Sequence, residues 1–442
     1  MSIELSIELI TILMFGSLFI LLGLGLPVAF SCGTVGVIFT ALLQGPSAIN
    51  IIPTRVFGLM VNYLLAAIPL FIFMANILER SGLIADIYEM VYQWVGHLKG
   101  GVATATVGAC TMMAAMVGVI GASEVTMGLI ALPEMLKRKY DKYLACGSIL
   151  AGGTLGILIP PSVMLIVYGM VDNSSIGQLY GGAFLPGFLL ASLYAIYITI
   201  RCYINPQMGP PIPKEERLPL SRRIRLLFPL LPAGILIFLV LGTIFIGIAA
   251  PTEAAGVGAA GAIIIAILQG RLKWKGIVEA AENTLKSSAM VLWTMFGANI
   301  FVALYVMVGG GQFVTNLLVG SGLSRWVILW IMQLILIFLG CFIDWVGIIM
   351  LTIPIFGPII RQLGFDPIWF GVLFAVNLQM SFLTPPFGYA LFYLKGVAPP
   401  EVTTTDIWRS AAPFLGLQFI GLVLCMIFPE IILIVPKLFY RG

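Results

Sequence analysis

Two short motifs in this sequence place paired prolines among apolar and hydroxyl-bearing residues. They read Gly156-Ile-Leu-Ile-Pro-Pro-Ser162 and Ser381-Phe-Leu-Thr-Pro-Pro-Phe-Gly388. Each proline removes a backbone donor and disfavours helix in the residue before it, so two in succession predict an unwound stretch inside a helix. The carbonyl groups freed there need partners, and a desolvated cation is one, besides protein donors and water.

Hydroxyl groups lie near both motifs, and hard cations prefer such oxygen ligands. The residues concerned are Ser123, Thr126, Thr154, Ser162, Ser381 and Thr384. Helix C-termini with bare carbonyls suit Na⁺, and helix N-termini suit a carboxylate. The chemistry predicted from these residues is therefore the binding of a small cation and an organic anion.

Three acidic residues fall in or beside apolar stretches, where an ionised side chain is costly and a functional role is the default hypothesis. Glu124 and Asp344 interrupt two such stretches, and a bond to nearby backbone amides is the structural alternative for both. Glu253 follows Pro251, and this order is more typical of the start of a helix than of a functional acid. Asn377 is a further candidate, with polar contact between helices as its alternative role.

The composition decides the environment in which these residues act. Of 442 residues, 60% are hydrophobic and only 10% are charged, and the mean hydropathy is +1.09. A soluble domain carries roughly a quarter charged residues, so lipid must be the solvent for most of this chain. The net charge of +4 gives no indication of a nucleic-acid partner, because the basic residues lie in loops between apolar stretches. One His and six Cys without a C-x-x-C pair argue against a metal enzyme or a disulfide framework.

Periodic apolar stretches predict an all-α polytopic membrane protein with about ten spanning helices. Each stretch is near the ~20 residues that a helix needs to cross a bilayer. The predicted spans are 8–25, 27–44, 58–78, 143–170, 182–201, 226–248, 250–269, 286–309, 367–394 and 411–435.

Two further apolar stretches, 101–133 and 326–360, are broken in the middle. The breaks are Gly118-Val-Ile-Gly-Ala-Ser-Glu124 and Gly340-Cys-Phe-Ile-Asp-Trp-Val-Gly347. They predict two re-entrant hairpins, each with a non-helical tip at membrane depth, and such tips must line a cavity or pack against protein. Glu124 and Asp344 would lie at these tips.

Basic residues set the predicted orientation, with the N-terminus outside. The segments 79–100, 134–142, 201–225, 270–286 and 395–410 hold 18 of the 23 Lys and Arg residues and are assigned to the cytoplasm. Full crossings in place of the hairpins would put Lys137, Arg138, Lys139 and Lys142 outside, which is the weaker arrangement.

The two halves repeat the same landmarks. Pro27, Pro133, Asp141 and Pro160-Pro161 recur as Pro251, Pro358, Asp366 and Pro385-Pro386, at separations of 224, 225, 225 and 225 residues. We predict two inverted repeats, 1–201 with broken helix 143–170 and 226–442 with broken helix 367–394, joined by a cytoplasmic linker at 202–225. Inverted repeats of this kind are typical of transporters.

The motifs together resemble the large membrane subunit, DctM type, of tripartite ATP-independent periplasmic (TRAP) transporters. The resemblance covers nearly the whole chain. It lies in Gly25-Leu-Pro-Val-Ala-Phe30, Gly128-Leu-Ile-Ala-Leu-Pro-Glu134, Tyr140-Asp-Lys142, Gly153-Thr-Leu-Gly-Ile-Leu-Ile-Pro-Pro-Ser162, Pro251-Thr-Glu-Ala-Ala255 and Gly364-Phe-Asp-Pro367. The stretches Leu378-Gln-Met-Ser-Phe-Leu-Thr-Pro-Pro-Phe-Gly388 and Leu394-Lys-Gly-Val-Ala-Pro-Pro400 are similar to the subgroup linked to 2-oxo acids, mannitol and chloroaromatic acids.

The resemblance implies Na⁺-driven import of a small organic acid across the bacterial inner membrane by an elevator motion. It also implies a small four-helix membrane subunit and a periplasmic substrate-binding protein as partners. Matching the family's sodium sites places one ion near Ser123, Thr126, Gly156, Ile159 and Pro160, and a second near Gly340, Ser381 and Thr384. Substrate or coupling candidates are Glu124, Asp344, Ser162 and Asn377.

One departure from the family affects the coupling ion. Many members carry a Ser-rich first tip, whereas this chain has Gly121-Ala-Ser-Glu-Val-Thr126, so Glu124 would either strengthen cation binding or couple a proton. Three alternatives stay open: a stand-alone ion- or proton-coupled carrier, an intramembrane enzyme using Asp344 and Glu124, and a channel. The enzyme would need converging carboxylates and the channel a continuous polar path. No Walker-type phosphate loop occurs in the sequence, so an ion gradient or a partner must supply the energy.

Overall fold

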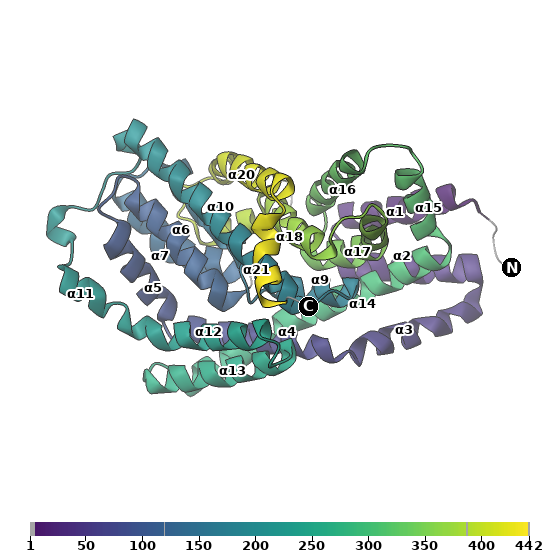
Figure 1. Ribbon diagram of the computed structural model, residues 1–442, viewed down its shortest axis with the longest axis horizontal. Coiled ribbons are helices and arrows are strands. Elements are labelled where there is room, and N and C mark those ends of the chain that lie inside the picture. The colour runs from purple at the N-terminus through teal and green to yellow at the C-terminus, as the bar shows by residue number, and fades with distance from the viewer. Residues whose placement is uncertain (1–4, 119, 386–387, 441–442) are drawn as a thin grey trace.

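The computed structural model describes residues 5–118, 120–385 and 388–440, and within these ranges it contains helices and no strand (Figure 1). The first half holds α1 (Ile7–Gly23), α2 (Val28–Gln44), α3 (Ile51–Met60), α4 (Ala67–Arg80), α5 (Leu83–Val95), α6 (Gly101–Val117), α7 (Ile120–Lys137), α8 (Lys142–Thr154), α9 (Val163–Asp172) and α10 (Ile176–Ile204). The all-α fold class is confirmed.

The second half repeats this order. It holds α11 (Leu220–Arg225), α12 (Leu231–Phe245), α13 (Pro251–Leu268), α14 (Trp274–Met307), α15 (Gly310–Val319), α16 (Arg325–Gly340), α17 (Trp345–Gln362), α18 (Pro367–Leu383), α19 (Tyr389–Val397), α20 (Thr404–Ile427) and α21 (Glu430–Phe439). The helices α16, α17, α18 and α19 begin 224, 225, 225 and 226 residues after α6, α7, α8 and α9. The repeat seen in the proline pattern is therefore also a repeat of helices.

Both predicted hairpins form. The helices α6 and α7 pack against each other, as do α16 and α17. The first tip is shorter than predicted, because α7 already begins at Ile120 and so includes Ser123 and Glu124. Gly118 ends α6 in the left-handed region at φ 59°, which favours glycine, and Val119 lies outside the described residues. Glu124 is thus a helical residue just past the tip, which corrects its predicted place at the turn.

Both predicted broken helices are also found. The helix α8 ends at Thr154, a 3₁₀ turn covers Leu155–Ile157, and α9 begins at Val163. Near the second proline pair α18 ends at Leu383 and α19 begins at Tyr389, while Pro386 and Phe387 lie outside the described residues. The missing N–H groups of proline explain why the helices stop there.

Three predicted spans have different ends. The span 411–435 is divided between two helices. The first, α20, begins at the Thr403–Asp406 capping box and ends at Ile427, and the second, α21, begins after Pro429. The span 58–78 is interrupted where the Asn62 side chain accepts from the Leu64 amide (3.0 Å). The span 286–309 is the later part of α14. Seven helical stretches of the described chain are long and apolar enough to cross a membrane, and Tyr63–Arg80 and Thr404–Ile427 are among them, whereas α9 and α18 of the broken helices are shorter.

The helices α2, α4, α13 and α14, called here the frame, pack against one another along one side of the molecule. In Figure 1 α4, α13 and α14 run along its lower side. Glycines bring α2 and α14 close, since a Cβ at Gly297 would overlap the Ala29 carbonyl oxygen, and one at Gly36 would lie 2.9 Å from the Phe301 nitrogen. Small residues allow such backbone contact in membranes.

The two hairpins and the two broken helices, α6–α9 and α16–α19, are called here the inner body. Its helices interlock across the repeats, with α17 against α9, α19 against α7, and α18 against α9. At one end Arg361 of α17 forms an ion pair with the buried Asp172 of α9 (2.9 Å). The inner body meets the frame mainly where α17 contacts α14 and α6 contacts α4.

The segment predicted as the linker contains the end of α10 and all of α11, and the stretch between them is bonded to the open end of the first hairpin. The Gly100 amide donates to the Gly209 carbonyl (2.8 Å), and the Ile212 amide donates to the Gly96 carbonyl (2.9 Å). The linker is therefore held to the inner body.

Candidate functional site

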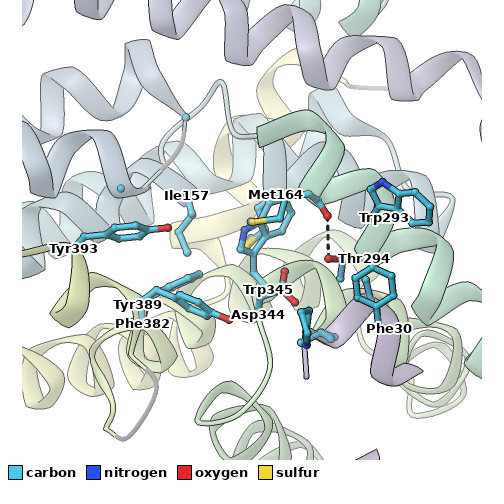
Figure 2. A pocket seen from close by; sticks show the side chains of 16 residues that line it. Phe30, Ile157, Met164, Trp293, Thr294, Asp344, Trp345, Phe382, Tyr389 and Tyr393 are labelled. Atoms are coloured by element: carbon cyan, nitrogen blue, oxygen red, sulfur yellow. Dashed lines mark hydrogen bonds between the residues drawn. The ribbon is translucent and has the colours of Figure 1, made fainter. Parts of the chain in front are cut away.

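A cavity of about 410 Å³, called here the central cavity, lies where the tips of the two hairpins face each other (Figure 2). Gly118 and Gly121 line it from the first hairpin, and Asp344 and Trp345 line it from the second. The unwound or terminal parts of the broken helices add Ile157 and Phe382, with Met164, Tyr389 and Tyr393. The inner body therefore contributes one wall from each repeat.

The frame closes the opposite side of the central cavity. The start of α2 contributes Pro27–Phe30, and α14 contributes Met290, Trp293 and Thr294. Thr294 donates its hydroxyl to the Met290 carbonyl (3.0 Å), the bond drawn in Figure 2. The cavity thus lies between the frame and the inner body, so a relative movement of the two would change its shape.

Asp344 is the charged side chain among the described residues that line the cavity, and no Lys, Arg or His lines it there. It is the N-cap of α17, and its Oδ1 accepts from the Gly347 amide at 3.3 Å. Its Oδ2 has no hydrogen-bond partner in the described chain, and the residue is only 8% exposed. In Figure 2 the carboxylate points into the cavity. Asp344 therefore bonds a backbone amide as a helix cap, which is the structural role considered from the sequence. It also presents one oxygen, without a partner in the described chain, to a ligand.

The first predicted ion site gathers where α7 packs against the unwound part of α8–α9. A Cβ at Gly118 would overlap the Pro161 carbonyl oxygen, so the hairpin tip contacts the break directly. The Ser123 hydroxyl is buried without a partner in the described chain. No donor of the described residues reaches the carbonyl oxygens of Gly156, Ile159 or Pro160. Orphaned oxygens of this kind fit a desolvated Na⁺.

One member of the first ion set, Thr126, and the substrate candidate Ser162 have other partners. Thr126 points towards α4, where its hydroxyl is 3.4 Å from Glu79 Oε1. Ser162 caps α9, because its hydroxyl donates to the Ile157 carbonyl and accepts from the Leu165 amide at 3.3 Å. Ser162 does not line the cavity, so its geometry matches a structural cap rather than a substrate ligand.

The second predicted ion site is compact. A Cβ at Gly340 would overlap the Oγ and Cβ of Ser381, which brings the end of α16 directly against α18. The Ser381 hydroxyl is buried and has no partner in the described chain. The Thr384 hydroxyl donates to the Met380 carbonyl (2.7 Å), which leaves its lone pairs available. Ser381 and Thr384 lie 225 residues after Gly156 and Ile159, so the broken-helix members of the two sites occupy equivalent positions in the two halves.

Asn377 lies away from the cavity lining. Its Nδ2 donates to the backbone carbonyl of Gln333 (3.0 Å) and to the Gln333 side chain (2.6 Å). The bonds join α18 to α16 in a fully buried position. The structure therefore supports the role of polar contact between helices, which the sequence left open.

Glu124 is fully buried, and both carboxylate oxygens have no hydrogen-bond partner among the described residues. The side chain packs on α8, where a Cβ at Gly153 would lie 2.5 Å from its Cδ and Oε1. Its contact with α8, at Gly153, is three residues before Gly156, and Glu124 does not line the cavity. Glu124 and Asp344 therefore do not share a pocket as two catalytic carboxylates would. By contrast, Glu253 Oε2 accepts from the Ala250 amide (2.9 Å), which confirms its helix-start role.

Sequence reasoning missed the aromatic lining of the cavity. Tyr389 and Tyr393 come from α19, Trp345 from α17, and Phe30 and Trp293 from the frame. The i, i+4 spacing of the two tyrosines directly after the second proline pair was a usable signal. Phe30 and Trp293 gave none, because aromatic residues in membrane helices also face lipid.

Comparison with known proteins gives the same family as the motifs in the sequence. The family model "Tripartite ATP-independent periplasmic transporter, DctM component" matches residues 15–431. The chain is 31% identical over 401 residues to the C4-dicarboxylate TRAP transporter large permease protein DctM of Pseudomonas aeruginosa, covering 90% of this chain and 92% of that protein. It is 28% identical over 430 residues to the isethionate TRAP transporter permease protein DctMQ of Oleidesulfovibrio alaskensis, covering 97% and 66%.

The fold is similar to a solved structure. The crystal structure of the Alcanivorax borkumensis YdaH transporter, described as having an unusual topology, aligns with a TM-score of 0.61 at 16% identity, covering 87% of this chain and 89% of that one. The hairpins, the broken helices and the family match over most of the chain lead to one conclusion. This protein belongs to the DctM family, the large permease components of tripartite ATP-independent periplasmic transporters.

Proposed function

We propose that this permease imports a small organic acid together with Na⁺ across the bacterial inner membrane, receiving the solute from a periplasmic binding protein. Membership of the family makes the chain a multi-pass transport protein and not an enzyme. The relatives named for C4-dicarboxylate and isethionate support an organic acid as the solute class.

One observation carries the proposed Na⁺ coupling. At the first site the broken helix brings bare carbonyl groups near the buried Ser123 hydroxyl of the hairpin, and at the second the broken helix brings the buried Ser381 hydroxyl against the end of α16; neither hydroxyl has a partner in the described chain. Buried polar atoms are nearly always satisfied, so sets of orphaned oxygens call for a ligand. An oxygen-only set of this kind suits a hard monovalent cation better than a transition metal.

The elevator motion is proposed from the division of the central cavity. Its walls come from two packed bodies, the frame and the inner body, and the predicted ion ligands lie within the inner body. Movement of the inner body along the frame would carry ions and solute together. The proposed partners are the binding protein and a small four-helix membrane subunit. The relative named DctMQ, of which this chain covers 66%, supports the small membrane subunit as a partner.

The first test is uptake into proteoliposomes that contain this chain with its small subunit. A labelled organic acid is supplied on the periplasmic binding protein, with and without an inward Na⁺ gradient. We expect uptake that needs both the gradient and the binding protein. Uptake that does not depend on Na⁺ but follows a pH gradient would replace Na⁺ coupling with proton coupling. The candidate group is then the buried Glu124, which has no partner among the described residues. Uptake without the binding protein would support a stand-alone carrier.

The predicted ligands are tested by Ser123→Ala and Thr384→Ala. Each removes one oxygen from one predicted site, so the half-saturating Na⁺ concentration of uptake should rise roughly three- to tenfold, as expected for one lost ligand of a charged group. The amount of folded protein should stay unchanged. A hydroxyl variant on α10, Ser192→Ala, is the matched control, because within the described chain Ser192 bonds only its own helix, at Phe188 O (2.7 Å). An unchanged Na⁺ dependence in both test variants would remove the site assignment.

A further inference from the structure

We propose that the solute bound in the central cavity carries a positively charged nitrogen, held between the Asp344 carboxylate and the surrounding aromatic rings. The inference rests on the proposed function, because it takes the central cavity as the place where the solute is carried. It narrows the solute from an organic acid in general to a zwitterionic acid with an ammonium or quaternary ammonium group.

The first argument is charge. Among the described residues, Asp344 contributes a carboxylate oxygen without a partner, it is nine-tenths buried, and no basic side chain lines the cavity with it. A simple anion bound there would lose its hydration beside a like charge, which is unfavourable at low dielectric. A cationic group would instead give Oδ2 the partner that it lacks.

The second argument is the shape and chemistry of the walls. Phe382 and Tyr389 of the inner body pack with ring centroids 6.4 Å apart, and Phe30 and Trp293 of the frame pack with centroids 6.2 Å apart. Figure 2 shows the two pairs on opposite sides of Asp344. Aromatic faces attract ammonium groups, and tryptophan does so most strongly. Aromatic rings on two sides and a carboxylate between them form a recognised kind of site for such cations.

The third argument concerns the acid group of the solute. The first backbone bond of α2 is donated by Phe30 to the Pro27 carbonyl (3.0 Å), so the amides of Val28 and Ala29 precede it at the cavity wall. Such amides carry partial positive charge and suit a carboxylate. Val28 also lies beside α17, since its side chain would be 2.9 Å from a Cβ at Gly347. A zwitterion could therefore bridge from Asp344 of the inner body to α2 of the frame.

A coupling ion is the other cation that could lie at Asp344. Na⁺ needs several oxygen ligands, whereas the cavity wall around Asp344 consists mainly of aromatic and aliphatic side chains. In the part of the chain that the structure describes, the orphaned hydroxyls of Ser123 and Ser381 and the bare carbonyl groups of the first broken helix lie outside that wall. The arrangement therefore favours an organic cation in the cavity and Na⁺ elsewhere.

The test compares two probes that differ in one atom, betaine (trimethylammonioacetate) and its uncharged-carbon isostere 3,3-dimethylbutanoate. The sample is the purified complex of this chain with its small subunit, and the readout is tryptophan fluorescence, because Trp293 and Trp345 line the cavity. We expect betaine to bind at least roughly tenfold more tightly than the isostere. Asp344→Asn keeps a good helix cap and should abolish that preference.

The matched control is Asp366→Asn, at another N-cap aspartate. Asp366 accepts from the Ile368 and Trp369 amides (2.8 and 3.0 Å) and does not line the cavity, so the preference for betaine should survive. Equal or tighter binding of the isostere, a preference that persists in Asp344→Asn, or no response to either probe would overturn the inference.

A thermal unfolding series with Na⁺ in the same sample separates this inference from the proposed function. Stabilisation by Na⁺ without a preference for betaine would overturn the cationic solute alone. A preference for betaine without any Na⁺ effect would contradict the proposed coupling ion and leave the cavity inference in place.

Discussion

Replacing Gly340 with alanine is expected to lower Na⁺-driven uptake by roughly tenfold to a hundredfold, since misplacement by about 1 Å has costs of this size. The added Cβ would overlap the Oγ and Cβ of Ser381 and lie 3.3 Å from its Cα. Rotating the hydroxyl does not relieve the overlap with Cβ, so α16 must move away from α18. That movement would separate the predicted ligands of the second ion site, and the half-saturating Na⁺ concentration should rise.

A double substitution separates packing from ion binding. Ser381→Gly removes the overlapping atoms, so Gly340→Ala with Ser381→Gly should regain the thermal stability lost in Gly340→Ala, while Na⁺ affinity stays low because the Ser381 hydroxyl is gone. Gly416→Ala on α20 is the control, because a Cβ there would meet no atom of the described residues within 4 Å. Wild-type Na⁺ affinity in Gly340→Ala, with the protein folded, would show that this contact plays no part in the ion site.

Glu124→Gln is expected to weaken Na⁺ activation of uptake roughly tenfold or more, because it removes a charge that acts at low dielectric. The carboxylate is fully buried, it has no partner in the described chain, and it follows directly after Ser123. An unpaired buried charge costs several kcal/mol, so a nearby cation would compensate it. Glutamine keeps the shape and loses the charge. Uptake over a series of Na⁺ concentrations, at constant pH, measures the effect.

Glu253→Gln is the matched control for this substitution. Glu253 also lies near the end of an apolar helix, but its side chain caps α13 through the Ala250 amide (2.9 Å), a bond that glutamine can also accept. Its Na⁺ dependence should equal that of the unsubstituted protein. If Glu124→Gln also leaves Na⁺ activation unchanged, the carboxyl group is a neutral packing element and contributes nothing to coupling.

The broken helices show how far sequence reasoning reached. Pro160-Pro161 and Pro385 act through the backbone of their own segment, so their effect needs no tertiary information. The same holds for the glycine at Gly118, where the chain leaves α6 with a positive φ. Such local effects predicted both hairpins and both interrupted helices within a few residues.

The side-chain environments could not be obtained in this way. Asn377 and Asp344 are both polar residues in apolar segments, yet Asn377 bonds Gln333 of α16 and Asp344 faces a cavity. Ser162 and Ser123 are both serines beside a break, yet Ser162 caps a helix and Ser123 has no partner in the described chain. The difference depends on neighbours that are distant in the sequence.

The sequence by itself determined the membrane environment, the all-α class, the two hairpins, the two broken helices and the repeat at about 225 residues. These follow from hydropathy, from proline and glycine, and from the order of landmarks, all of which are properties of local chain segments. Only the tertiary structure decided that the hairpin tips meet at one cavity, that the frame supplies Phe30 and Trp293 to it, and that one Asp344 oxygen has no partner there among the described residues. Those facts arise from the packing of helices from both halves, and packing fixes which side chains find partners and which are left to bind a ligand.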